Sequence, residues 1–245
     1  HPLWGVEGTE LTEDFPADHL HHRGVFWAWH QVWIGDQRIG DPWEIKNFEQ
    51  EITEVEFSAQ QNGSAVLNTE VEWKSDKWIK NGVKTPYLKE NTSIQIHPKI
   101  GNVRRIDFEI RLLALEENLK IGGSEDVKGY SGFSVRMILP DDVQFSGPDG
   151  IIEPQNEAVQ SAGYVNVAGS LLDGKKAGGI VMVDNADNPG FPQSWILRKK
   201  NSMQNAAFPG NKKLAISTNE PLILNYSLLI YSGELNNKKI QKILK

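Results

Sequence analysis

Apolar and polar residues alternate over most of the chain, and this pattern limits the fold more than any other feature of the sequence. It is clearest in residues 64–73, 104–115, 132–139 and 222–233, where most apolar residues recur two positions apart. Successive side chains of a strand point to opposite faces of a sheet. Such segments are therefore typical of antiparallel strands with one buried face.

Roughly ten segments of this kind are separated by turns rich in Gly, Asn and Pro. The only helical pattern lies at residues 234–245, and the chain has no low-complexity linker and no internal repeat. The sequence therefore predicts an all-β fold, a large antiparallel β-sandwich with a short C-terminal helix. We expect a single domain over residues 1–245.

The composition excludes several classes of protein. A net charge of −6 argues against a nucleic-acid partner, and no apolar run approaches the roughly 20 residues of a membrane span. Because the chain has no cysteine, disulfides, thiolate metal ligands and a cysteine nucleophile are excluded. The motifs of serine hydrolases, P-loop NTPases, zinc peptidases and dinucleotide-binding enzymes are also missing. The sequence gives no indication of the oligomeric state.

Residues 14–33 contain four of the six histidines of the chain, with Arg23 between them and three tryptophans directly after. A single histidine in an irregular loop usually ties down the backbone. Four in twenty residues instead favour a functional site, because histidine titrates near neutral pH and both binds and transfers protons.

On an extended backbone, His19 and His21 point to the same side and form the beginning of a metal site. A closed site needs further ligands, which His30, His97 or Glu44 would have to supply. Since no known metal-binding spacing is present, we predict no cofactor as the leading interpretation. A divalent metal held by His19 and His21 is kept as an alternative.

On a helical backbone, Asp18, His21 and His22 become neighbours instead. This geometry suits an acid–base pair in which the carboxylate of Asp18 fixes the tautomer of His22.

Five of the eight tryptophans lie in the first 43 residues. Indole has an apolar face and one N–H donor, so it suits a ligand with an apolar face and a polar rim, such as a sugar ring. We expect one or two of these rings, with Trp27 and Trp29 as candidates, to line a cleft. The alternative is that both pack one face of a sheet.

A second dense patch is the glycine-flanked segment 122–137. Lys128 and Arg136 are suited to bind an anionic or hydroxyl-rich group, and Tyr130 is suited to donate a hydrogen bond or act as a base. The alternative is a solvated turn between strands.

Glu90 and His97 bracket a predicted strand. They are therefore placed to face a cleft from its two ends. We take Glu90 as a candidate partner in acid–base chemistry and His97 as a candidate ligand contact.

The first 29 residues resemble the N-terminal signature of a bacterial domain family of unknown function that carries the name methane oxygenase PmoA. Asp18, His19, His21, His22 and Arg23 match this signature. Looser similarity continues through most of the chain and ends near residue 233. The resemblance also implies one or two strands before residue 1. A membrane-bound methane oxygenase subunit needs spanning helices, which this sequence lacks, so we treat the name of the family as a misnomer.

Such domains are similar to the galactose-mutarotase-like β-supersandwich, which sugar epimerases, lyases and glycosidases use. The resemblance implies a carbohydrate ligand and a periplasmic or secreted location. We therefore expect a hydrolase, lyase or epimerase that acts on a sugar by histidine and carboxylate chemistry. A non-catalytic carbohydrate-binding module is the alternative from another class.

The expected catalytic residues are His21, His22, Asp18, Tyr130 and Glu90. The expected substrate-binding residues are His19, Arg23, Trp27, Trp29, His97, Lys128 and Arg136.

Overall fold

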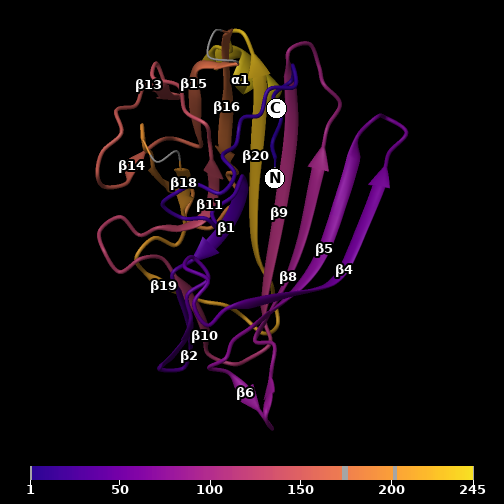
Figure 1. Ribbon diagram of the computed structural model, residues 1–245, viewed down its shortest axis with the longest axis vertical. Coiled ribbons are helices and arrows are strands. Elements are labelled where there is room, and N and C mark those ends of the chain that lie inside the picture. Colours follow the sequence, from indigo (N-terminus) through magenta and orange to yellow (C-terminus); the bar gives the residue numbers. More distant parts are fainter. Residues whose placement is uncertain (1, 173–175, 201–202, 245) are drawn as a thin grey trace.

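The computed structural model describes residues 2–172, 176–200 and 203–244. Its largest part is a nine-stranded antiparallel sheet that runs the length of the molecule (Figure 1). From one edge to the other, its strands are β13 (Gly150–Ile151), β12 (Gln144–Gly147), β15 (Tyr164–Leu172), β16 (Lys176–Asp184), β20 (Leu222–Ser232), β9 (Val103–Ala114), β8 (Leu88–Ile96), β5 (Ala65–Lys74) and β4 (Glu49–Ala59).

Two smaller sheets form the second layer. The five-stranded sheet consists of β1 (Val25–Trp29), β11 (Ser131–Arg136), β18 (Met203–Ala207), β17 (Ser194–Ile196) and β14 (Val159–Gln160). The four-stranded sheet consists of β19 (Lys213–Ala215), β10 (Leu119–Gly122), β2 (Gln31–Ile34) and β3 (Gln37–Gly40). The remaining elements are the hairpin of β6 (Ile79–Lys80) with β7 (Val83–Lys84) and the helix α1 (Asn237–Ile243).

Aromatic contacts hold the two layers together. Phe133 of β11 lies between two rings of the large sheet, 5.1 Å from the ring of Phe108 and 4.5 Å from that of Tyr226. Trp29 of β1 packs at 5.8 Å from Trp73 of β5 in the same way. The prediction of an all-β sandwich with a short C-terminal helix is thus confirmed.

The alternating pattern predicted most strands well but not their burial. In β9 the residues at every second position are buried, as expected. In β4 every residue is exposed, including Ile52, Val55 and Phe57, because this strand extends beyond the smaller second layer (Figure 1). The tryptophan-rich residues after the histidine loop also form strands, since β1, β2 and β3 lie within residues 25–40.

Two tryptophans proposed as ligand contacts belong to the core instead. Trp29 is fully buried and its indole N–H donates to the carbonyl oxygen of Phe208 at 2.9 Å. Trp27 stacks on Phe133 and donates to Glu90 at 3.0 Å. Trp29 is thus a core residue, and the half-buried ring of Trp27 packs against the same core, so the sheet-packing alternative describes both.

Glu90 also lies between the layers and not at the mouth of a cleft. Its carboxylate accepts hydrogen bonds of 3.0 Å each from Trp27 Nε1, Trp73 Nε1 and Thr92 Oγ1. Burial raises the pKa of Glu90 against the effect of these three donors. The carboxylate thereby links β1, β5 and β8 across the interior.

We predict that Glu90→Gln lowers the free energy of unfolding by roughly 1–3 kcal/mol, because the amide offers one oxygen to three donors and turns its own N–H groups toward them. Urea unfolding measures this effect, with Gln95→Ala on the outward face of the same strand as the control. An unchanged unfolding midpoint for Glu90→Gln would contradict the placement of this carboxylate in the core.

Candidate functional site

The histidine-rich loop is held against the end of β11 by backbone hydrogen bonds. The N–H of Glu13 donates to the carbonyl of Arg136 at 3.0 Å, and the N–H of Arg136 donates to the carbonyl of Gly24 at 2.7 Å. Gly24 has φ of +63°, a left-handed conformation that glycine adopts without strain. Both ends of the loop 13–24 are therefore fixed to one strand end.

Two successive turns within this loop bring two imidazoles together. The N–H of His19 donates to the carbonyl of Pro16 at 3.2 Å, and the N–H of His22 donates to that of His19 at 2.9 Å. The rings of His19 and His22 stack in parallel with centroids 4.7 Å apart. Phe26 covers the other face of His22 at the same distance, so His22 lies between two rings.

The backbone carbonyl of Trp43 fixes two of the histidines. It lies 2.8 Å from His21 Nε2 and 2.9 Å from His22 Nε2. Since a carbonyl only accepts hydrogen bonds, both rings carry a proton on Nε2. Burial lowers the pKa of His22 to about 4, although the bond to Trp43 opposes this change. His22 is therefore a neutral ring at pH 7, and its buried Nδ1 has no hydrogen-bond partner among the described residues.

Asp18 pairs with His19 and not with His22, which corrects the geometry predicted from the sequence. Its Oδ2 lies 3.1 Å from His19 Nδ1, and its Oδ1 accepts a hydrogen bond from Arg136 Nη2. Burial opposes ionisation of Asp18, but the hydrogen bond with His19 and the charge of Arg136 outweigh it and lower the pKa. The ionised carboxylate holds the proton of His19 on Nδ1, so Nε2 is the acceptor; it lies 3.8 Å from Oε1 of Glu44, which also lines the pocket.

Arg136 is the most buried charge of this region. Its side chain is 3% exposed, and its Nε lies 3.2 Å from Glu13 Oε2 while Nη2 contacts Asp18. A buried guanidinium is stable only when paired, so the two carboxylates keep it in place. In return, Arg136 holds the carboxylate of Asp18 in position beside Nδ1 of His19.

A second imidazole with a carboxylate partner lies nearby. The Nδ1 of His30 is 3.3 Å from Asp41 Oδ2, which also accepts a 3.1 Å hydrogen bond from Arg38 Nη2. The ring of His30 stacks on that of Trp43 at 5.3 Å. The sequence suggested His30 only as a metal ligand and gave no indication of this pair.

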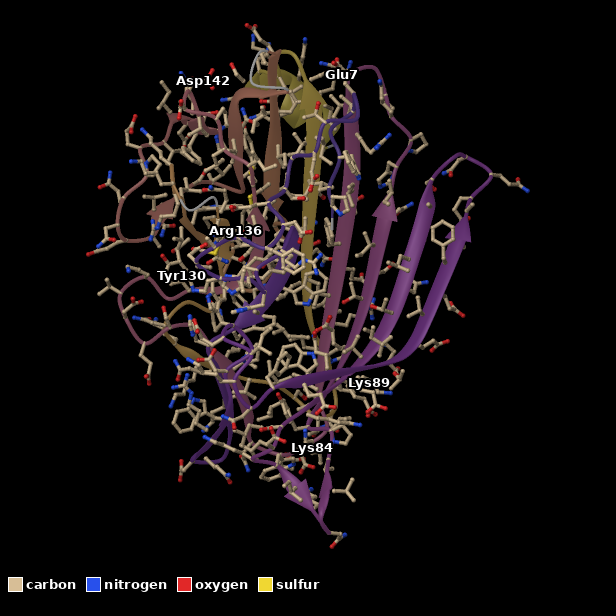
Figure 2. The ribbon with its side chains drawn as sticks, viewed as in Figure 1. Glu7, Lys84, Lys89, Tyr130, Arg136 and Asp142 are labelled. Carbon is tan, nitrogen blue, oxygen red and sulfur yellow. The ribbon has the colours of Figure 1, made fainter. Side chains whose placement is uncertain are left out.

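These groups meet in a pocket of about 280 Å³. It is lined by Asp18, His19, His22, His30, Trp43, Glu44, Tyr130, Arg136, Arg198 and Met203. The histidine loop and the glycine-flanked turn thus share one hollow, and Tyr130 and Arg136 lie close to each other in it (Figure 2). The position of Tyr130 depends on Gly129, because a Cβ there would lie 2.6 Å from the backbone nitrogen of Asn211.

Sequence reasoning missed two features of this pocket. Arg198, which is not among the candidate residues of the sequence analysis, donates from Nη2 to the hydroxyl oxygen of Tyr130 at 2.9 Å. Trp43 forms the aromatic floor of the pocket: its ring is 3% exposed and lies 5.6 Å from the half-buried ring of Tyr130. Only the density of tryptophan before residue 44 pointed toward this ring.

A second, larger hollow adjoins the pocket and shares Asp18 and Arg136 with it. It measures about 670 Å³ and continues past Met137 and Pro140 to Lys199. Asp18 and Arg136 thus lie where the two hollows meet. A ligand in the first pocket therefore has room to extend into the second.

The other predicted site residues lie elsewhere. Arg23 pairs with Asp14 and covers the ring of Phe15 at 4.1 Å. Lys128 lies 3.9 Å from Asp126 and 5.8 Å from the ring centre of Tyr130, without lining the pocket. His97 is bonded to Asp107 at 2.7 Å on the outer face of the large sheet, far from the histidine loop in sequence, and lines another pocket. His21 contacts Trp43 but is absent from the pocket lining.

The described residues include no group of three or more His, Asp or Glu side chains arranged to hold a metal ion. The rings of His19 and His21 are nearly perpendicular, with centroids 6.0 Å apart, and Nε2 of His21 is directed at a backbone carbonyl. Among all the residues that the structure describes, no helix is long and apolar enough to cross a membrane.

A model described as a family of unknown function, DUF6807, matches residues 1–245. The chain belongs to the DUF6807 family. This membership agrees with the expected domain of unknown function but not with the PmoA name. No curated protein matches the chain. For this DUF6807 member, the chemistry of the pocket is therefore the main guide to function.

We predict that stability falls as the pH drops from about 6.5 to about 4, because the unfolded chain binds a proton at His22 that the folded chain does not. The stabilisation is complete above the ordinary pKa of histidine and is lost toward the folded pKa. After allowance for solvent screening, the loss amounts to about 2 kcal/mol.

Urea unfolding of wild type and His22→Gln at about pH 7 and pH 4.5 measures this contribution, since glutamine keeps a donor for Trp43 but does not titrate. His21→Gln is the matched control at the same carbonyl. If wild type and His22→Gln lose equal stability on acidification, the neutral state assigned to His22 is wrong.

Proposed function

We propose that this protein is a carbohydrate-active enzyme in which His19, oriented by Asp18, acts as general acid and base on a sugar. The observation that carries the proposal is the Asp18–His19 pair at a pocket with an aromatic surface. The carboxylate lies 3.1 Å from Nδ1 of the imidazole, which leaves Nε2 for proton transfer. A positioned general acid or base contributes roughly 10²–10⁴-fold to such a step.

The pocket favours proton transfer at carbon or at the ring oxygen over hydrolysis by two carboxyl groups. His19 and His30 each have a carboxylate at Nδ1, so one ring can accept a proton while the other delivers one. Hydrolysis by a carboxyl pair needs one protonated acid. Asp18 is unsuited to that role because its pKa is lowered. An epimerase or lyase type of reaction is therefore our leading class, with a hydrolase second.

The remaining lining groups suit a sugar. The half-buried ring of Tyr130 and the small accessible part of Trp43 supply apolar surface, while Arg198 and Glu44 supply polar groups. Sugar rings have apolar faces and polar edges, and aromatic side chains bind the former. The resemblance to galactose-mutarotase-like domains supports the same ligand class, and it is also the basis for proposing a periplasmic or secreted location.

The decisive variant is His19→Gln. We expect it to reduce turnover by at least 100-fold while sugar affinity changes by less than about threefold, since the ring transfers protons and glutamine retains a polar contact. Monosaccharides and uronic acids are incubated in D₂O, and NMR follows both product formation and deuterium incorporation at carbon.

His21→Gln provides the comparison, because His21 touches the same stack but does not line the pocket. We expect its turnover to stay within about fivefold of wild type. Loss of turnover in His21→Gln but not in His19→Gln would overturn the assignment. Equal loss of affinity in both, without any turnover in wild type, would favour a non-catalytic carbohydrate-binding module.

Asp18→Asn tests the positioning role of the carboxylate. Asparagine offers both donor and acceptor groups, so His19 is no longer held in one tautomer, and we expect kcat to fall roughly 10- to 100-fold with KM nearly unchanged. Asp14→Asn is the matched control, because Asp14 pairs with Arg23 outside the pocket. A rise in KM with kcat unchanged would show that Asp18 binds the substrate and does not orient His19.

A further inference from the structure

A second pocket lies on the outer face of the large sheet, beside the C-terminal helix. It has a volume of about 640 Å³ and shares no lining residue with the histidine pocket. The helix lies over the ends of β16 and β20 (Figure 1), where Ile240 packs with Val181 and Leu229. The pocket opens between this helix, the segment 97–102 and the start of β9.

The walls of this pocket are held in place by polar contacts. Asn236 caps the helix by accepting from the N–H of Lys239 at 3.1 Å. Asn237 Nδ2 donates to the carbonyls of Gly147 and Pro148 at 3.2 Å each. On the opposite wall, Asn102 Nδ2 donates to the carbonyl of Ser232. The space between the walls is therefore a built feature and not the result of a loosely attached helix.

Apolar side chains cover much of the inside and the rim. They are Pro98, Ile100, Val103, Leu235 and Ile243. Ile100 is 80% exposed at the rim, which is unfavourable unless an apolar group packs against it. The pocket thus offers space and apolar contact to the hydrocarbon part of a ligand.

All charged lining groups of the pocket are basic, although the chain as a whole has a net charge of −6. Arg105 donates from Nε to Asp107 Oδ1 at 2.7 Å, and His97 Nε2 lies 2.7 Å from Asp107 Oδ2, so one carboxylate behind the wall orients both. Lys239 and Lys242 project from the helix on the other side and form no salt bridge within the described part of the chain. The cationic rim therefore favours an anionic head group.

We propose that this pocket binds a small amphiphilic anion, a carboxylate with an apolar chain. The chain packs on Ile100, Val103 and Ile243, and the carboxylate is held between the lysines of the helix and Arg105. Burial of each CH₂ group tightens binding by about fourfold, so an alkyl chain of medium length provides most of the affinity and the charges provide selectivity. The site is independent of the reaction proposed for the histidine pocket.

Decanoate, below the concentration at which it forms micelles, is the probe. Isothermal titration calorimetry should show one saturable site on the wild-type protein, and decanol should bind more weakly because it lacks the charge. We expect Lys242→Gln and Ile100→Ser each to weaken decanoate binding by about fivefold. Lys238→Gln is the matched control, because it removes the same charge from the same helix but does not line the pocket.

The His19→Gln protein should bind decanoate as wild type does, which separates this site from the proposed function. Equal weakening by Lys242→Gln and Lys238→Gln, or no saturable binding at all, would overturn the proposal. Sedimentation with phosphatidylglycerol and phosphatidylcholine vesicles is the further test. Binding to the anionic vesicles without binding to free decanoate would show that the basic helix recognises a lipid surface, and that outcome also contradicts the proposed pocket ligand.

Discussion

The buried guanidinium of Arg136 joins the fold to the candidate site. Arg136 is the last residue of β11, the strand that packs Phe133 against the large sheet. Its backbone closes the histidine loop at both ends, and its side chain pairs with Glu13 and Asp18. Because an unpaired charge in this position would cost several kcal/mol, the loop cannot detach without exposing or isolating it. The rigidity of the sandwich is thereby transmitted to Asp18 and so to the ring of His19.

The tryptophans have two different roles, packing inside the sandwich or lining the pocket, and the contacts of each ring and its N–H show which role it has. Trp27 and Trp73 donate to Glu90 inside the sandwich, so neither is able to bind a ligand by its N–H. Trp43 has a different position, because its backbone N–H donates to Trp29 and its carbonyl accepts from two histidines. Its ring is thus fixed through the main chain while one side remains part of the pocket. Both Glu90 and Trp43 are buried, but only Trp43 lies in the wall of the pocket.

Much of the fold could be predicted from the sequence, because the alternation of β5, β9 and β20 follows directly from the geometry of a strand. The burial of β4 could not be predicted, since alternation shows which side chains share a face but not whether another layer covers it. In the site, the histidine-rich loop and the glycine-flanked segment were both recognised from the sequence. The pairing of Asp18 with His19 was not, because it depends on turns whose ends are fixed by a strand more than one hundred residues away. The roles of Glu90 and Arg198 likewise depend on long-range partners that no local pattern records.

The neutral state of His22 explains why an imidazole stands at the centre of the stack. A phenylalanine would stack equally well between His19 and Phe26 but could not donate to the carbonyl of Trp43, which would then lose one of its two donors. A protonated ring would satisfy that carbonyl but would place a second cation beside Arg136 and against the face of His19. A neutral, buried imidazole alone provides the flat surface, the hydrogen bond and the absence of charge together. His22 is therefore best understood as the support on which His19 and Trp43 are held, and the proton-transfer role falls to the ring that Asp18 reaches.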